Sequence, residues 1–225
     1  MLRWRLAGPF NYSGSIINVS ALANTSFASG GGTKDRHGSF FTFKGQTYFT
    51  CNDESHGGGG GFRNTIISYV HYRANGTIAT IRIDETGVGM YNVSGGAERI
   101  EAEDYYEIVG GRKAQLPSGP DDFAVVGLQN GSALTYPRLH GGSGRALTLL
   151  LANGGAVSGT VVVSANGKQV ASCAVQPTGG WAEYKAVACG RLPSTGDGPL
   201  DLELGFRAAQ AGELARLDAL QLRAQ

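Results

Sequence analysis

The sequence predicts an all-β protein made of two parts, with a β-sandwich in the second half and a smaller group of strands before it. Three observations carry this prediction. Apolar residues recur in short alternating runs, which is typical of half-buried strands. Glycine makes up 36 of the 225 residues and falls mostly at turns, as expected for many short strands joined by tight loops. The one helix candidate, residues 208–216, is interrupted by Gly212.

The composition limits the possible partners. Hydrophobic residues make up 41% of the chain, which is enough for a folded core. Charged residues make up only 16%, and the formal net charge is +1. Nucleic acids and anionic membranes are bound by strongly basic surfaces, so we expect neither as a partner. No window of 18 apolar residues occurs, so we expect no transmembrane helix.

Residues 1–95 contain two hairpin signals but no complete architecture. Runs 38–43 and 46–51 flank Lys44-Gly45, and runs 64–72 and 78–83 flank a turn containing Asn75-Gly76. Four strands joined in this way match one antiparallel blade of a β-propeller. A single blade cannot bury both of its faces, because repeat units of this kind need neighbours. We therefore expect this part to be a remnant of a larger domain.

Residues 99–225 are interpreted as a complete domain. The predicted strands span approximately residues 99–104, 122–127, 132–136, 145–152, 159–164, 168–175, 181–189, 200–206 and 216–223. The clearest turns are Ala165-Asn166-Gly167 and Thr178-Gly179-Gly180. This many short strands in one domain predicts a jelly-roll or related β-sandwich, and the segment is long enough to fold alone.

The first strand of this domain carries a pair of acids. In Ile100-Glu101-Ala102-Glu103, the two glutamates would point to the same side of a strand. Two carboxylates on one face repel each other unless a cation lies between them, and calcium prefers oxygen ligands of this kind. The alternative is an exposed acidic edge strand. The residues alone leave both interpretations open.

The cysteines and glycosylation motifs point to an extracellular protein, although the N-terminus lacks the apolar region of a signal peptide. Cys173 and Cys189 lie in two apolar runs that flank Gln176–Gly180. A hairpin there would place the two runs side by side and allow a disulfide, which would close a loop of about 15 residues. The alternative is two buried thiols. Asn-x-Ser/Thr motifs begin at Asn11, Asn18, Asn24, Asn75, Asn92 and Asn130.

Four pieces of the second half resemble carbohydrate-binding module family 6. They are Ile100–Tyr105, Leu128–Ser132 with Tyr136, Thr178–Trp181 with Tyr184, and Leu217–Leu222. The resemblance covers essentially all of residues 99–225. It implies a jelly-roll β-sandwich that holds a structural calcium ion. By position, Glu101 and Glu103 from the first strand and Asp218 from the last would be the metal ligands.

The resemblance also implies a polysaccharide-binding cleft in the loops at one edge of the sandwich. A flat aromatic ring beside a few hydrogen-bonding groups suits a sugar, which has apolar C–H faces and polar edges. Trp181 falls on one aromatic position of the cleft; the alternative is a core tryptophan. The second aromatic position aligns with Gly127, and the position of a hydrogen-bonding Asn aligns with Arg216. Phe123 is a candidate to replace the missing ring.

The first half resembles the end of a glycoside hydrolase family 43 catalytic domain. The matching pieces are Gly8–Gly14, Asp35–Phe41, Tyr48–Asp53 and Gly61–Tyr72. The family implies a five-bladed propeller with an inverting active site. His37 matches a histidine near the propeller axis, and Arg63 matches an arginine that reaches into the sugar pocket. We interpret His56 and His71 as structural.

The resemblance implies that the catalytic carboxylates of that family come from earlier blades, and the given sequence starts after those positions; Asp35, Asp53 and Glu54 are not their counterparts. We therefore predict no catalytic residues here and no glycosidase activity by the chain alone, since His37 and Arg63 cannot replace a general acid–base pair. The predicted function is binding of a plant or algal cell-wall polysaccharide of the xylan or arabinan type. The alternatives are a fragment of an active secreted inverting glycosidase, and a structural or adhesive sandwich without a sugar site.

Overall fold

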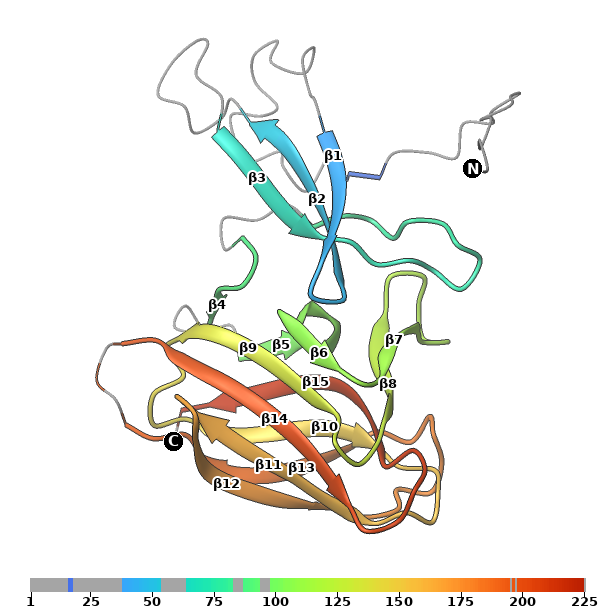
Figure 1. Ribbon diagram of the computed structural model, residues 1–225, viewed down its shortest axis with the longest axis vertical. Coiled ribbons are helices and arrows are strands. Elements are labelled where there is room, and N and C mark those ends of the chain that lie inside the picture. The colour runs from blue at the N-terminus through green and yellow to red at the C-terminus, as the bar shows by residue number, and fades with distance from the viewer. Residues whose placement is uncertain are drawn as a thin grey trace, which may run out of the picture.

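The computed structural model describes residues 16–17, 38–53, 64–82, 87–93, 98–194, 196 and 198–224. Almost all regular structure in these ranges is β-strand, as the sequence predicts, and the single 3-10 turn η3 spans Ala102–Asp104 (Figure 1). No helix in these ranges has the length and apolar character needed to cross a membrane.

Strands β1 (Gly38–Phe43), β2 (Gln46–Asp53) and β3 (Asn64–Tyr69) form an antiparallel sheet in that order. Lys44 and Gly45 both have positive φ, at 51° and 76°, which is the conformation of a tight type I′ hairpin. The prediction of four strands is wrong in its last member. In the described residues, Ile78 and Ile81 make only isolated bridges, to Tyr72 and Ile17 respectively.

Two sheets form the sandwich of the second half. The first sheet has the order β13 (Lys185–Arg191), β10 (Ala146–Ala152), β15 (Ala215–Arg223), β8 (Phe123–Leu128), β7 (Arg112–Gln115), and β5 (Arg99–Glu101) also pairs with β15. The second sheet has the order β12 (Lys168–Val175), β11 (Gly159–Ala165), β14 (Leu200–Ala208), β9 (Ala133–His140), β4 (Tyr91–Asn92), and β6 (Glu107–Val109) also pairs with β9.

The main core lies between these two sheets. Leu147, Leu149 and Leu151 alternate along β10 and are almost fully buried, because successive side chains of a strand point to opposite faces. Each of the nine predicted strands has a counterpart, but three differ by three or more residues at one end: β9 continues to His140, beyond the predicted end at residue 136. Residues 102–104 form η3, and residues 181–184 are a turn before β13. The short strands β4, β6 and β7 were not predicted.

The predicted disulfide is confirmed, but the predicted hairpin around it is wrong. Cys173 and Cys189 are bonded, with 4.7 Å between their Cα atoms. However, β12 and β13 are edge strands of different sheets and do not pair with each other. The connection between them crosses from one sheet to the other. The disulfide therefore fastens the two layers of the sandwich together below the loop that carries Trp181.

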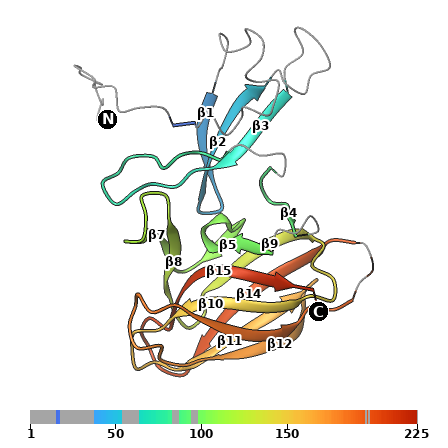
Figure 2. The same cartoon turned by 180° about the vertical axis from the view of Figure 1, so that it is seen from behind.

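The two parts of the chain are stacked (Figures 1 and 2). The sheet β1–β3 stands over the side of the sandwich that holds β5, β6 and β7. The loops that follow β10, β12 and β14 gather at one end of the sandwich, at the lower right in Figure 1. We call these loops, residues 153–158, 176–184 and 209–214, the loop end.

Candidate functional site

Trp181 is half-buried at the loop end and belongs to neither of the buried hydrophobic cores in the described residues. The loop after β10 passes close beneath it. A Cβ atom at Gly154 would lie 2.5 Å from the Trp181 backbone nitrogen and 2.6 Å from its Cγ, which no side chain can do. Glycine at this position therefore allows the two loops to meet. The alternative of a core tryptophan does not hold.

Two polar residues, Asn153 and Thr178, tie these loops together. No sequence signal marked Asn153, and Thr178 was expected only as part of the family motif. The Asn153 backbone N–H donates to Thr178 Oγ1 at 2.9 Å, and the Thr178 N–H donates to the Asn153 carbonyl at 2.8 Å. The Asn153 side-chain amide donates to the carbonyl of Val157 at 2.7 Å. Asn153 is fully buried. The loops that hold Trp181 are thus fixed by internal hydrogen bonds.

The structure brings Trp181, Arg216 and Gly127 together, and Glu213 is the residue that connects them. The Arg216 guanidinium lies over the Trp181 ring, 4.8 Å from its centroid. Glu213 Oε1 accepts hydrogen bonds from Arg216 Nε at 3.0 Å and from the Gly127 N–H at 2.8 Å. No sequence signal marked Glu213, because a single acid in a loop is usually solvated.

Phe123 does not supply a second ring at the loop end, so that expectation is wrong. Its side chain is 1% exposed, and its ring lies 5.2 Å from the ring of His71 in the first part of the chain. At the Gly127 position, a Cβ atom would contact only the backbone of Gly111. Neither Gly127 nor Phe123 thus supplies a ring to pair with Trp181 at the loop end.

The three acids matched to a calcium site lie close in the fold, although an arginine occupies the space between two of them. Glu101 in β5 pairs opposite Ala219, next to Asp218 in β15. Arg99 donates to Glu101 Oε1 at 2.8 Å and to Asp218 Oδ2 at 2.9 Å. Burial raises the pKa of Asp218, and Arg99 opposes this effect.

Glu103 fits a cation better. Its side chain is buried, and Oε2 has no hydrogen-bond partner. Burial and the neighbouring charge of Asp104 raise the pKa of Glu103 well above its ordinary value. A cation would remove both penalties. Nevertheless, no three His, Cys, Asp or Glu side chains in the described ranges are grouped as metal ligands. Calcium binding therefore stays a prediction, with donors of the right kind.

The residues that follow the acid pair join the sandwich to the sheet β1–β3. Gln46, fully buried in β2, donates to the carbonyls of Glu103 and Tyr105 at 3.0 and 2.9 Å. Lys113 in β7 donates to Gln46 Oε1 and, at 3.0 Å, to the carbonyl of Val70. We call Gln46, His71, Arg82, Asp104 and Lys113 the junction cluster.

Asp104 is the anionic centre of the junction cluster. It pairs with Arg82, and His71 Nε2 lies 3.1 Å from its Oδ1. Burial alone would raise the pKa of Asp104. The hydrogen bond from His71 and the charge of Arg82 nevertheless keep this pKa below its ordinary value. Burial also lowers the pKa of His71, which is consistent with a neutral ring that accepts from Lys113 at Nδ1 and donates to Asp104. His71 is structural, as the sequence predicts.

Two residues predicted to bind substrate in the first part, His37 and Arg63, lie outside the described residues. Their roles stay predictions. The described part of this half supplies Gln46, His71 and Arg82 to the junction cluster, and it has a small core that includes Phe49 and Val70.

The fold and the loop end define a two-sheet β-sandwich module that presents one aromatic ring on loops at its edge. Residues 97–224 match the family described as carbohydrate binding module (family 6), which is more than half of the chain. The chain therefore belongs to carbohydrate binding module family 6.

Two solved structures show similar folds. A glycoside hydrolase family 43 arabinoxylan arabinofuranohydrolase from Bacillus subtilis, in complex with cellotetraose, is 23% identical with a TM-score of 0.52; the match covers 98% of this chain and 46% of that one. A β-1,3-glucan binding family 6 module from Bacillus halodurans is 20% identical with a TM-score of 0.52, covering 60% of this chain and 99% of that one. This chain thus spans less than half of the hydrolase. No curated protein matches it.

Proposed function

We propose that this protein binds a cell-wall polysaccharide of the xylan or arabinan type through its loop end. The observation that carries the proposal is Trp181, held half-exposed on Gly154 in a family 6 module. The ring offers an apolar platform for the C–H face of a sugar. Arg216 and Glu213 beside it offer donors and acceptors for hydroxyl groups.

The lack of a second ring shapes the expected specificity. Without a ring at Gly127, a sugar would be held from one side by Trp181 and would not be clasped between two rings. One-sided stacking tolerates branched or substituted chains, which a narrow slot would exclude. Glu213 pairs with Arg216 at Nε, and we propose that the guanidinium group also accommodates a chain that carries acidic substituents.

Affinity electrophoresis tests the proposal. Gels that contain xylan, arabinan, galactan or β-glucan should retard the wild-type protein in at least one case, and Trp181→Ala should abolish the retardation. Tyr72→Ala is the matched control, because it removes another exposed aromatic ring, 49% exposed, outside the module. If no gel retards the protein, or if Trp181→Ala migrates like Tyr72→Ala, the loop end is not a sugar site and the structural or adhesive alternative is favoured.

A second proposed function is glycoside hydrolysis within a longer protein. The observation in its favour is that the likeness to the arabinofuranohydrolase extends over 98% of this chain, so that both parts and their junction share its fold. In this proposal the acid and base lie in blades that precede the described strands. Release of arabinose or xylose from aryl glycosides by the protein encoded by the extended reading frame would support it, and an extended frame without paired carboxylates would reject it.

We also propose that the protein is extracellular. The disulfide between Cys173 and Cys189 is a feature of oxidising compartments. Asn75 and Asn130 begin glycosylation motifs and are exposed. Detection of the protein in culture medium, with a mass that falls after glycosidase treatment, would support this, and its recovery in the cytosol with reduced thiols would reject it.

A further inference from the structure

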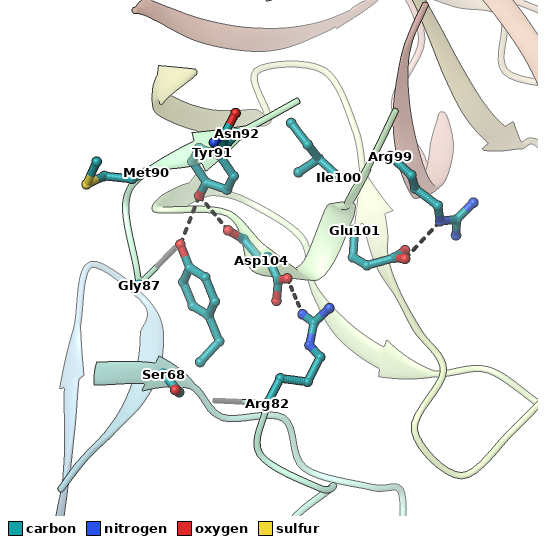
Figure 3. Close-up of a pocket in the computed structure, with 11 residues that line it drawn as sticks. Ser68, Arg82, Gly87, Met90, Tyr91, Asn92, Arg99, Ile100, Glu101 and Asp104 are labelled. Atoms are coloured by element: carbon teal, nitrogen blue, oxygen red, sulfur yellow. Dashed lines mark hydrogen bonds and ion pairs between the residues drawn. The ribbon is translucent and has the colours of Figure 1, made fainter. Parts of the chain in front are cut away.

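We propose that the pocket at the junction of the two parts is a second carbohydrate site, which binds one neutral sugar unit. This proposal rests on the proposed function, because it assigns a ligand of the same chemical class to a different place. The pocket encloses about 190 Å³ and lies between β3, β4 and β5. Figure 3 shows Arg82, Arg99, Glu101, Asp104, Met90 and Asn92 around it.

The position of the pocket separates it from the loop end. It is lined by residues of both parts, including Ser68 from the first sheet and Ile100 from the sandwich. The residues that support Trp181 come from the connections after β10, β12 and β14, and none of them lines this pocket. Ligand sites in proteins often occur where two structural units meet.

The polar groups of the pocket are already fixed before any ligand arrives. Asp104 is held by His71 and Arg82, and Arg99 and Glu101 hold each other. The Tyr91 hydroxyl donates to the Asp104 carbonyl at 2.5 Å, and the two tyrosine hydroxyls of Tyr69 and Tyr91 lie 3.0 Å apart (Figure 3). Preorganised groups of this kind reduce the ordering cost of binding.

The charged residues that line the pocket indicate which class of ligand it binds. Two guanidinium groups, from Arg82 and Arg99, face two carboxylates, from Glu101 and Asp104, so the formal charges cancel. The arginines disfavour a cation, and the carboxylates disfavour an anion. A strongly apolar ligand would leave these groups without solvent. A neutral polyol suits them, because its neighbouring hydroxyls both donate and accept.

The size of the pocket narrows the range of possible ligands further. The cavity is smaller than the pockets that take drug-sized ligands, so it suits a single ring and not several. A free monosaccharide and the terminal unit of a chain share this chemistry.

Gly87 in the pocket wall allows a direct test. It has φ of 72°, a conformation that asparagine tolerates better than most residues, and a Cβ there would meet no atom within 4 Å. Gly87→Asn therefore adds bulk to the pocket with little strain. Gly76→Asn is the matched control, because Gly76 has φ of 82° and equally open surroundings in a hairpin outside the pocket.

Four proteins should be titrated with methyl xyloside, methyl arabinofuranoside, methyl glucoside and a xylo-oligosaccharide, with binding followed by saturation-transfer NMR and the fold checked by melting temperature. They are wild type, Trp181→Ala, Trp181→Ala/Gly87→Asn and Trp181→Ala/Gly76→Asn. We expect Trp181→Ala to retain binding of at least one glycoside, Gly87→Asn to weaken that residual binding at least about tenfold, and Gly76→Asn to leave it unchanged. Binding of methyl glycosides alone indicates a free sugar, and binding that also includes the oligosaccharide indicates a chain end.

Other outcomes overturn the inference. If wild type binds and Trp181→Ala binds none of the ligands, the loop end is the sole sugar site, and the junction proposal fails while the proposed function stands. If Gly87→Asn and Gly76→Asn behave alike, the residual site lies elsewhere. If wild type itself binds no ligand in this set and no polysaccharide in gels, both proposals fail.

Discussion

The two sides of the sandwich use polar residues in opposite ways. At the loop end, Trp181 and Arg216 are only partly buried, and Gly154 lets the loop after β10 pack closely against Trp181. At the junction, Gln46 is fully buried, and it meets Lys113 and the backbone after Glu103 in the contact between two sheets. The first arrangement leaves groups available for a ligand, whereas Gln46 and Lys113 in the second fix one part of the chain on the other. The comparison teaches that a cluster of charged residues in a sequence can serve attachment as readily as binding.

The disulfide offers the largest test of this comparison, because it closes the loop that carries Trp181 and makes no contact with the junction cluster in the bonds described above. Replacing both Cys173 and Cys189 by serine opens a loop of 16 residues in sequence separation. We expect a loss of about 3 kcal/mol in the free energy of unfolding, measured by urea denaturation. Sugar binding should weaken as well, because Trp181 lies within that loop. Unchanged stability would show that the bond contributes nothing to the fastening of the two sheets.

Asp104→Ala tests the junction through the same quantity, the free energy of unfolding. It leaves the His71 ring and Arg82 without their shared acceptor, and the expected loss of stability is about 2–3 kcal/mol by urea denaturation. Binding at the loop end should be retained. Glu107→Ala is the control, since its pair with Lys44 is exposed and such pairs contribute little. Equal effects of the two substitutions would contradict the central role given to Asp104.

The ease with which each feature could be predicted follows from the range of the interactions involved. The Lys44-Gly45 and Asn166-Gly167 turns were predictable, because a type I′ hairpin needs positive φ at two adjacent residues, and the structure has it at both. The crossing between β12 and β13 was not, because Gly179-Gly180 looks the same in a hairpin and in a connection between sheets. Trp181 and Arg216 came from the family resemblance, whereas Glu213, Asn153 and the junction cluster depend on contacts distant in sequence.

Lys113 predicts a pH dependence specific to the junction. Burial lowers its pKa from 10.5 to about 8, although Asp104 and Glu103 oppose the shift. Below pH 8 lysine is protonated in both folded and unfolded states, so the cost of burying the charge is fully present. Between pH 8 and 10.5 the unfolded state binds more protons, so stability rises with pH.

We expect wild type to gain about 2 kcal/mol of unfolding free energy between pH 7 and 9.5, at 1.36 kcal/mol per pKa unit. Lys113→Met should lose this gain, as measured by urea denaturation at both pH values. A gain of the same size in Lys113→Met would assign the dependence to other groups.

The smallest expected effect concerns calcium, whose predicted ligands Glu101 and Glu103 lie on the junction side of the sandwich. With calcium at ten times its dissociation constant, stability should rise by about 1.4 kcal/mol, and chelation should lower the melting temperature accordingly. Asp218→Ala should remove the response to calcium. A wild type that is indifferent to chelation, or an Asp218→Ala variant that responds equally, would reject the predicted site at Glu101, Glu103 and Asp218.

The most direct measurement is a calorimetric titration of an oligosaccharide from the polysaccharide that retards the wild-type protein. It should compare wild type, Trp181→Ala at the loop end and Lys113→Met at the junction. We predict that Trp181→Ala loses at least about tenfold in affinity, whereas Lys113→Met stays within about twofold of wild type. The opposite order, or equal losses in the two variants, would contradict the assignment of polysaccharide binding to the loop end.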